Sequence, residues 1–551
     1  MPVPHRRLAV SLLLLLALAL RTVGLADQPI HADEAMHLHP RAAVDVLTFD
    51  LMFNPPLFRV VTAAACAIER TVTASRVVPV LAGTLSVLLL YLLGLKTVGA
   101  RPALLASFLL AVHPWHIRHS QTVRCFVLLS FLVLLAAVLA DRRKGKTGWD
   151  TGAAAAGGLA MLTHYLAFAQ AAVESVRSLA SGRRRAAAAY ALPLVAVAGA
   201  LLPFLLPGTA RKVAAGSVAY ENGLLFLLSL IRATFTPGGL SLVAAVLLAG
   251  LGATVREARP LLLPPITWIA ATLAAGLAIP IEIRYSLPAL PFLLLLAATG
   301  ACAWWGSSAP EPSQGGCGDS PRHGVRGAPG ARSAPDSQGA AGVGRPRWRR
   351  IGAAVATLLL AAGVVRPLPD YYRCPSEPAP ALAIHPDLAH VEVDLRPLAA
   401  ELRQASAAAE PIFVAVRGPF HYRLAAELSL GRYPDNARLA ESNDITVFEA
   451  GTMRLVTAAP DSPELRPDRP GTPAAGKARG PCLLLREHVF PCTPAEGCVP
   501  AVSSSNADLL RCPQDSCARF PCTVGQLGRV TGVGLAGQPL QIADCRRRIE
   551  N

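Results

Sequence analysis

Two adjacent carboxylates, Asp33 and Glu34, lie between His31 and His37, shortly after the apolar run at 8–20. Acidic residues are rare at the edge of a membrane, and those that cluster there generally have a function. On a helix, Asp33 and His37 share one face. Asp33 could then deprotonate a hydroxyl group as a general base, with Glu34 or a histidine orienting it. Two alternatives are a helix cap formed by Asp33 and a divalent cation held by His31, Asp33 and His37.

Cationic and aromatic side chains recur at the ends of later apolar segments. Arginine binds phosphate oxygens in a bidentate manner, so these residues could hold the phosphate of a lipid. The candidates for phosphate binding are Arg124, His164, Arg284 and Tyr285, and the candidates for support are His37, His119 and Gln121. Anchoring to lipid headgroups or a structural role in the core are the alternative interpretations.

The composition is that of a membrane protein. Of the 551 residues, 52% are hydrophobic and 16% are charged, whereas soluble domains carry about 25% charged residues. The net charge of +16 could suggest nucleic-acid binding. However, the basic residues occupy short loops between apolar segments, which indicates topogenic positive-inside charge instead.

Apolar blocks that alternate with these basic loops predict about 11 transmembrane helices. Arg6 and Arg7 precede the first block, so the N-terminus is expected in the cytoplasm and the C-terminus outside. Arg21 is expected to snorkel to the interface, with 22–26 extending the first span. A cleaved signal peptide is the alternative interpretation of this block. The remaining predicted spans are 76–95, 102–112, 123–140, 151–163, 165–179, 187–206, 240–254, 261–280, 286–305 and 351–365. This topology places all the candidate site residues on the outer side.

The predicted fold is an all-α polytopic membrane domain with a small extracytoplasmic α/β domain and a cysteine-rich tail. Eight of the 12 cysteines follow residue 366 without paired CxxC motifs, so we expect disulfides rather than zinc sites, with a pairing that the sequence does not define. The predicted units are the membrane domain 1–306 with its outer loop 27–75, a disordered cytoplasmic linker 307–350, a last span 351–366, the α/β domain 367–458, a Pro-rich linker 459–480 and a disulfide-rich module 481–551.

The order of several short motifs resembles the GT-C superfamily of membrane glycosyltransferases, and in particular the protein O-mannosyltransferase and aminoarabinose-transferase-like bacterial group. Asp33-Glu34 looks like the first outer loop of that group. The later motifs resemble its proline turn, the start of its second span, its second outer loop and its late Arg-Tyr motif, at Asn54–Phe58, Ser75–Pro79, His113–Phe126 and Arg284–Pro291. Two departures are Gln121, where many relatives carry an acid, and Phe126, where the usual residue is tyrosine.

The resemblance implies a GT-C-like fold and an inverting transfer of a sugar from a polyprenyl-phosphate donor to an acceptor hydroxyl. The reaction would take place at the outer face of the cytoplasmic (inner) membrane, on a protein, lipid or glycan acceptor. Asp33 would be the base, Glu34 its support, and Arg124 and Arg284 contacts of the donor phosphate. No cofactor is required, although a divalent cation is compatible with the cluster. Two alternatives are a transporter or flippase of lipid-linked sugars, and a non-catalytic anchor that displays the cysteine-rich module.

Overall fold

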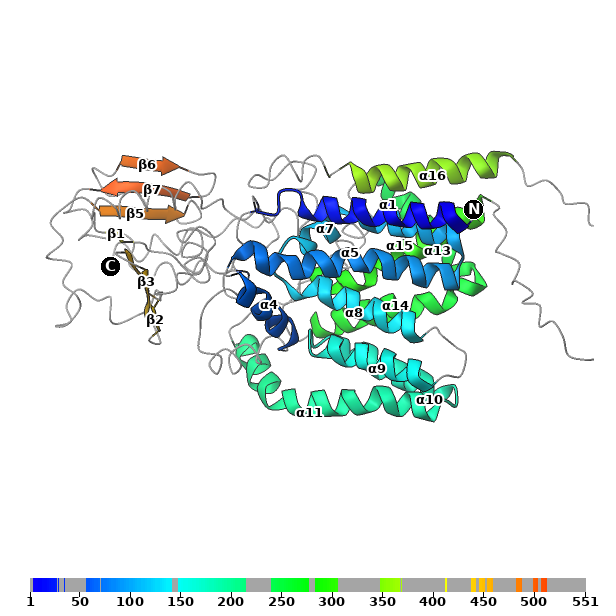
Figure 1. The fold of residues 1–551 in the computed structure, drawn as a ribbon, viewed down its shortest axis with the longest axis horizontal. Helices are drawn as coiled ribbons and strands as arrows, with labels where there is room; N and C mark the ends of the chain where they lie inside the picture. The colour runs from blue at the N-terminus through cyan, green and yellow to red at the C-terminus, as the bar shows by residue number, and fades with distance from the viewer. Residues whose placement is uncertain are drawn as a thin grey trace, which may run out of the picture.

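The computed structural model describes residues 3–26, 28, 34, 56–69, 71–140, 147–214, 239–276, 283–305, 347–366, 368 and seven short strands between 412 and 512. Apart from the single residues 28 and 34, the ranges up to residue 366 form a bundle of helices (Figure 1). In the first half these are α1 (Val3–Thr22), α4 (Leu57–Ile68), α5 (Val72–Thr97), α6 (Ala100–Ala111), α7 (Pro114–Ser120), α8 (Cys125–Ala140), α9 (Thr147–Met161) and α10 (Ala167–Ala180). The later helices are α11 (Arg184–Ala214), α13 (Gly239–Thr254), η1 (Arg256–Leu262), α14 (Leu263–Gly276), η2 (Ile283–Ala289), α15 (Leu290–Trp304) and α16 (Arg347–Val365).

The apolar blocks expected to span the membrane coincide with these helices. By length and apolar composition, three of the described helical segments can each cross a membrane: Val72–Thr97, Arg256–Ala275 and Arg284–Trp304. A fourth crossing arises if α7 and α8, which meet at an angle of 109°, count as one broken span. Several other helices are apolar but shorter, so the expected total of about 11 spans stays a prediction.

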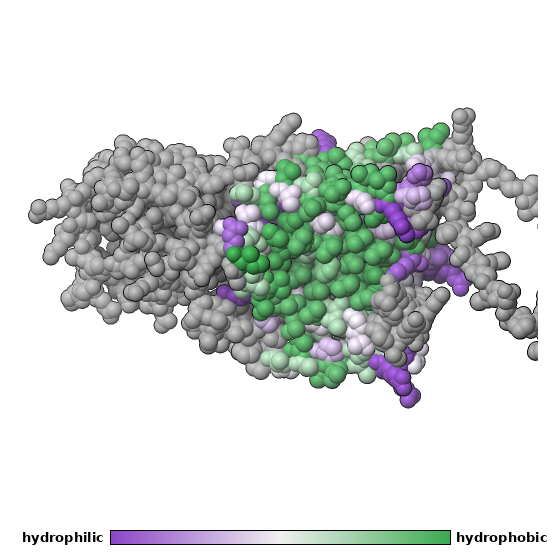
Figure 2. Space-filling view, in the orientation of Figure 1, coloured by the Kyte–Doolittle hydropathy of each residue, from purple (hydrophilic) through white to green (hydrophobic). Residues whose placement is uncertain are grey.

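The outward-facing residues of the bundle agree with a lipid environment. Large exposed apolar side chains include Leu8, Leu12 and Leu15 on α1 and Leu192 on α11. Figure 2 shows apolar residues covering the middle of the described face, with hydrophilic residues gathered toward its two ends. This pattern is what a helical bundle shows when its middle contacts lipid and its ends contact water.

Helix α5 runs through the centre of the bundle and organises its neighbours (Figure 1). The Thr71 hydroxyl caps its first turn by accepting a hydrogen bond from the Ala74 N–H at 3.1 Å. Its 26 residues correspond to a length of about 39 Å. It packs against α1, α4, α6, α7 and α8, so side chains at its N-terminal end can reach residues from several segments.

Helices α13 and α15 approach so closely that glycine is required on both. A Cβ atom at Gly300 would overlap the carbonyl oxygen of Leu248, and one at Gly252 would overlap the carbonyl oxygen of Leu296. Small residues of this kind let helix backbones come together inside membranes, where van der Waals packing drives association.

We expect Gly300→Ala to destabilise the bundle by about 1–3 kcal/mol, the usual cost of overpacking. The matched control is Gly250→Ala on the same helix pair, because a Cβ atom there has nothing within 4 Å. Thermal unfolding of the purified protein in detergent measures both variants. Equal unfolding temperatures for the two variants would contradict the packing argument.

The C-terminal strands form two small sheets. The first sheet is antiparallel and has the order β2–β3–β4. Its strands are β2 (Arg438–Glu441), β3 (Ile445–Ala450) and β4 (Met453–Ala458). Strands β3 and β4 pair as a hairpin, with Ala450 opposite Met453 at its closed end. The second sheet has the order β1–β5–β7–β6. Its strands are β1 (Ile412–Phe413), β5 (Cys482–Glu487), β6 (Val499–Ser503) and β7 (Ala507–Cys512). Because β1 pairs with β5 in parallel, strands from both sides of the Pro-rich stretch 459–480 share one sheet.

Candidate functional site

Glu34 is fully buried and accepts hydrogen bonds from an arginine side chain and from a main-chain N–H group. Its Oε1 accepts from Arg76 Nε at 3.0 Å and from the Val123 backbone N–H at 2.6 Å. Its Oε2 accepts from Arg76 Nη2 at 2.8 Å. This is a bidentate arginine–carboxylate pair, the strongest common form of charge-assisted hydrogen bond. The carboxylate therefore ties the first loop to α5 and to the turn that precedes α8.

Arg76 uses its remaining N–H groups to hold the chain that follows α1. Its Nη1 donates to the carbonyl oxygens of Leu25 at 2.6 Å and Gln28 at 3.1 Å. The side chain is 1% exposed. A buried charge is tolerated only when it is paired and hydrogen-bonded, and Arg76 meets both conditions. It fixes the end of α1 and Glu34 to the N-terminal end of α5.

A second buried arginine, Arg21, joins α1 to α6 and α7. Its side chain is fully buried, so the expectation that it snorkels to the interface is wrong. Its guanidinium donates to Ser120 Oγ, His116 Nδ1 and the carbonyl oxygens of Ala17, Ala111 and Leu110. Because arginine cannot accept a hydrogen bond, His116 Nδ1 is the acceptor and that ring is neutral, with its proton on Nε2. The C-terminal carbonyl groups of α6 are thus satisfied by a side chain from α1.

The turn between α7 and α8 is held from two sides. On one side Gln121, which is fully buried, directs its Nε2 to the carbonyl oxygens of Val23, Arg21 and Leu20 at the end of α1, at 2.9, 3.3 and 3.4 Å. On the other side Glu34 accepts from the Val123 N–H. These bonds fix the 109° bend between the two helices, and α8 begins at the bend.

Aromatic and cationic side chains from three segments meet around Phe126, in the first turn of α8. The ring of Phe126 lies 5.7 Å from that of His119, 5.7 Å from that of His164 and 5.5 Å from that of Tyr285. His164 and Tyr285 are themselves 5.2 Å apart. The Arg284 guanidinium carbon lies 5.8 Å from the centre of the Phe126 ring, within the range of a cation–π interaction. We call this group of five residues the Phe126 cluster.

The predicted site residues that the structure describes therefore come together at one end of the bundle. His119, His164, Arg284 and Tyr285 belong to the Phe126 cluster, and Arg124 is buried two residues before Phe126. Glu34 contacts the same turn through Val123. Asp33, His31 and His37 lie outside the described residues. Within the described part of the chain, no three His, Cys, Asp or Glu side chains form a group that could hold a metal ion.

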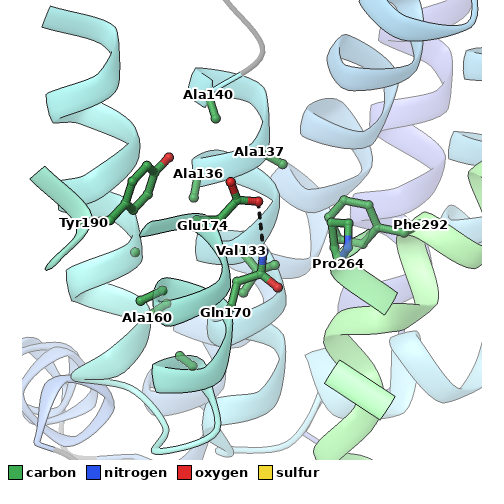
Figure 3. Close-up of a pocket in the computed structure, with 13 residues that line it drawn as sticks. Val133, Ala136, Ala137, Ala140, Ala160, Gln170, Glu174, Tyr190, Pro264 and Phe292 are labelled. Carbon is green, nitrogen blue, oxygen red and sulfur yellow. Dashed lines mark hydrogen bonds between the residues drawn. The ribbon is translucent and has the colours of Figure 1, made fainter. Parts of the chain in front are cut away.

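A small pocket lies elsewhere in the bundle, lined by residues of α8, α9, α10, α11, α14 and α15 (Figure 3). Its walls are mostly small apolar side chains, and its polar groups are Gln170, Glu174 and Tyr190. Gln170 donates to Glu174 at 3.4 Å, and Arg177 pairs with Glu174 at 3.3 Å. No lysine or arginine is among the described residues that line it. It therefore differs in chemistry from the cationic cluster at Phe126.

Three residues of this region were not predicted as site residues. Arg21 and Arg76 stand near the ends of apolar blocks, where the sequence favours an interfacial position, and only their distant partners reveal that they are buried. In the sequence, Phe126 stands out as a departure from a tyrosine pattern and not as a contact residue. Its place directly after Arg124 and Cys125 at the start of a long apolar block is the signal that could have identified it.

Residues 54–210 match the family model described as dolichyl-phosphate-mannose-protein mannosyltransferase. The match runs from just before α4 into α11, so it includes Arg76, Arg124 and His164, whereas Glu34 and Arg284 lie outside it. It confirms the predicted resemblance to GT-C superfamily membrane glycosyltransferases. Together with the apolar helices, it identifies the chain as a multi-pass membrane protein.

Among solved structures, the chain is similar to ArnT from Cupriavidus metallidurans in the apo state. The identity is 14%, the TM-score is 0.49, and the alignment covers 92% of this chain and 98% of that chain. It is also similar to the Archaeoglobus fulgidus oligosaccharyltransferase, with 12% identity, a TM-score of 0.42 and coverage of 77% and 64%. A third similar structure is the S. cerevisiae protein O-mannosyltransferase Pmt1-Pmt2 complex bound to the sugar donor. The identity is 18%, the TM-score is 0.28, and the alignment covers 38% of this chain and 32% of that chain. A search of curated proteins gave no match.

Proposed function

We propose that this chain is an inverting glycosyltransferase that moves a sugar from a polyprenyl-phosphate donor to an acceptor hydroxyl at the outer face of the membrane. The observation that carries the proposal is the convergence of the Phe126 cluster, Arg124 and Glu34 at one end of the bundle, from four separate segments of the chain. The match to a family named for transfer from dolichyl-phosphate-mannose supports the same class of donor.

Asp33 is the proposed base. A transfer with inversion needs a carboxylate that removes the proton of the acceptor hydroxyl while the oxygen attacks the anomeric carbon. The bond from that carbon to the lipid phosphate breaks, and the phosphate leaves with the bonding electron pair. Arg124 and Arg284, with Tyr285 and His164 beside them, are proposed to stabilise this charge. His119, Gln121 and His37 support the site.

Glu34 takes a positioning role in this scheme rather than that of a second base. Its oxygens already accept three hydrogen bonds, two from Arg76 and one from Val123. Because a single peptide bond joins Asp33 to Glu34, fixing Glu34 limits where Asp33 can lie. The Val123 contact then sets the base relative to the turn that carries Arg124. Should a divalent cation take part, His31, Asp33 and His37 are the residues proposed to hold it.

The experiment that tests this function uses the purified full chain in proteoliposomes with a panel of polyprenyl-phosphate-linked sugars. Mass spectrometry of the lipid should show release of polyprenyl phosphate with at least one donor when an acceptor extract is present. NMR of the glycosylated product should show the anomeric configuration opposite to that of the donor. Movement of intact donor across the bilayer without release would instead support a flippase and contradict the proposal.

A further inference from the structure

We propose that Phe126 is a positioning residue that orients Arg284, Tyr285 and His164 for the phosphate of the lipid donor. This inference rests on the proposed function. Phe126 is the residue that the other members of the cluster share as a neighbour, since His119, His164, Tyr285 and Arg284 all lie within 6 Å of its ring centre. Phe126 is 5% exposed, so its ring is a buried, packed part of the site and not part of the site's exposed surface.

A phenyl ring is well suited to hold an arginine that must bind an anion. The face of the ring attracts the guanidinium electrostatically, yet it takes no hydrogen bond from it. Phe126 therefore positions the guanidinium without using the N–H groups that recognise phosphate oxygens. A carboxylate in the place of Phe126 would hold Arg284 more strongly but would compete with the phosphate for the same donors.

The position of Phe126 is itself fixed by the acidic end of the site. Glu34 accepts from the Val123 N–H at 2.6 Å, and Phe126 follows three residues later in the first turn of α8. The same turn lies at the 109° bend between α7 and α8. One rigid turn thus connects Glu34, the neighbour of the proposed base, with the ring that contacts Arg284. Because both halves of the site share this turn, Phe126 sets the phosphate contacts at a defined place relative to the base.

The test compares Phe126→Leu with Phe126→Tyr in the full chain in proteoliposomes, measuring the KM of the donor and kcat separately. Leucine keeps an apolar side chain but removes the ring, so the KM of the donor should rise by roughly 3- to 30-fold, the factor that corresponds to an interaction of this kind. Tyrosine keeps the ring and should stay within about twofold of the parent protein. The matched control is Phe131→Leu, which removes a ring from the same helix outside the cluster.

A double-variant comparison shows whether Phe126 acts through Arg284. If it does, adding Phe126→Leu to Arg284→Met should raise the KM much less than it does in the parent protein, because the residue being positioned is already gone. Two results would overturn the inference. One is an unchanged KM in Phe126→Leu, and the other is the same fold-increase in KM from Phe126→Leu in the Arg284→Met background as in the parent protein. Thermal unfolding in detergent checks that the variants fold. If Phe126→Leu does not fold, Phe126→Met, which also removes the ring and keeps an apolar side chain, gives the same comparison with Arg284→Met.

Equilibrium binding of polyprenyl phosphate alone separates this inference from the proposed function. If the parent protein neither binds that lipid nor transfers sugar, the proposed function fails and the role of Phe126 fails with it. If the parent protein binds the lipid and Phe126→Leu binds it equally well, only the role of Phe126 is overturned. Weaker binding in Phe126→Leu, with parent-like binding in Phe131→Leu, is the result we expect.

Discussion

Asparagine in place of Asp33 should lower the rate of sugar transfer by about 10²- to 10⁴-fold, the range that a general base contributes. The amide is similar in size but cannot take the proton of the acceptor hydroxyl. Because the proposed phosphate contacts are elsewhere, the KM of the lipid donor should change little. Initial rates in proteoliposomes at saturating donor measure the effect.

The control for this prediction is Asp27→Asn, which removes a carboxylate from the same outer loop. It should keep a rate close to that of the parent protein. A rate for Asp33→Asn within twofold of the parent rate, in protein with an unchanged unfolding temperature, would remove Asp33 from the mechanism. Glu34 would not then be the natural replacement, because its carboxylate is held by Arg76 and Val123.

Glutamine in place of Glu34 should destabilise the protein by about 3–5 kcal/mol, because it leaves the Arg76 charge buried without a counter-charge. Arg76 is 1% exposed and Glu34 is fully buried, so water cannot replace the missing carboxylate. Unfolding of the purified protein in mixed detergent micelles measures the change. Glu69→Gln is the control, since Glu69 is exposed at the end of α4.

The double variant Glu34→Leu with Arg76→Met should recover part of this loss. Replacing both members of a buried ion pair by apolar residues is often neutral or stabilising, whereas removing one member is costly. Recovery should be partial, because Arg76 also donates to the carbonyl groups of Leu25 and Gln28. Equal stability of Glu34→Gln and Glu69→Gln would show that the pair does not hold the loop.

The helices could be predicted from the sequence because apolar blocks of sufficient length have few alternatives in a membrane. The block at 76–95 falls within α5, and the block at 123–140 begins two residues before α8 and ends with it. The short helix α7 and its 109° bend with α8 could not be predicted. They depend on the hydrogen bond that Gln121 donates to the Val23 carbonyl group and on the one that Glu34 accepts from the Val123 N–H. The partners in these bonds are 98 and 89 positions apart in the sequence.

The members of the site could be predicted in part, because ionisable residues near membrane segments are rare and stand out. His164 and Tyr285 were identified in this way, and they lie together. Arg21 was assigned to the interface because its place at the end of a span has the same local pattern as a snorkelling residue. Phe126 has no polar group of its own, and its place directly after Arg124 is the local signal for it. Its contacts with His164 and Arg284 depend on the tertiary fold, because these residues are distant in the sequence.

The burial of Arg21 also determines when this part of the protein can form during synthesis. Its partner Ser120 lies 99 positions later in the chain, and Ala111 lies 90 positions later. At about 5–20 residues per second, roughly 5–20 s separate the appearance of the arginine from that of its partners. During this interval the guanidinium has no acceptor from α6 or α7 and must reach water or headgroups at the membrane surface. The first helix is therefore expected to enter the membrane with Arg21 at the interface, and to draw it inward only when α6 and α7 arrive.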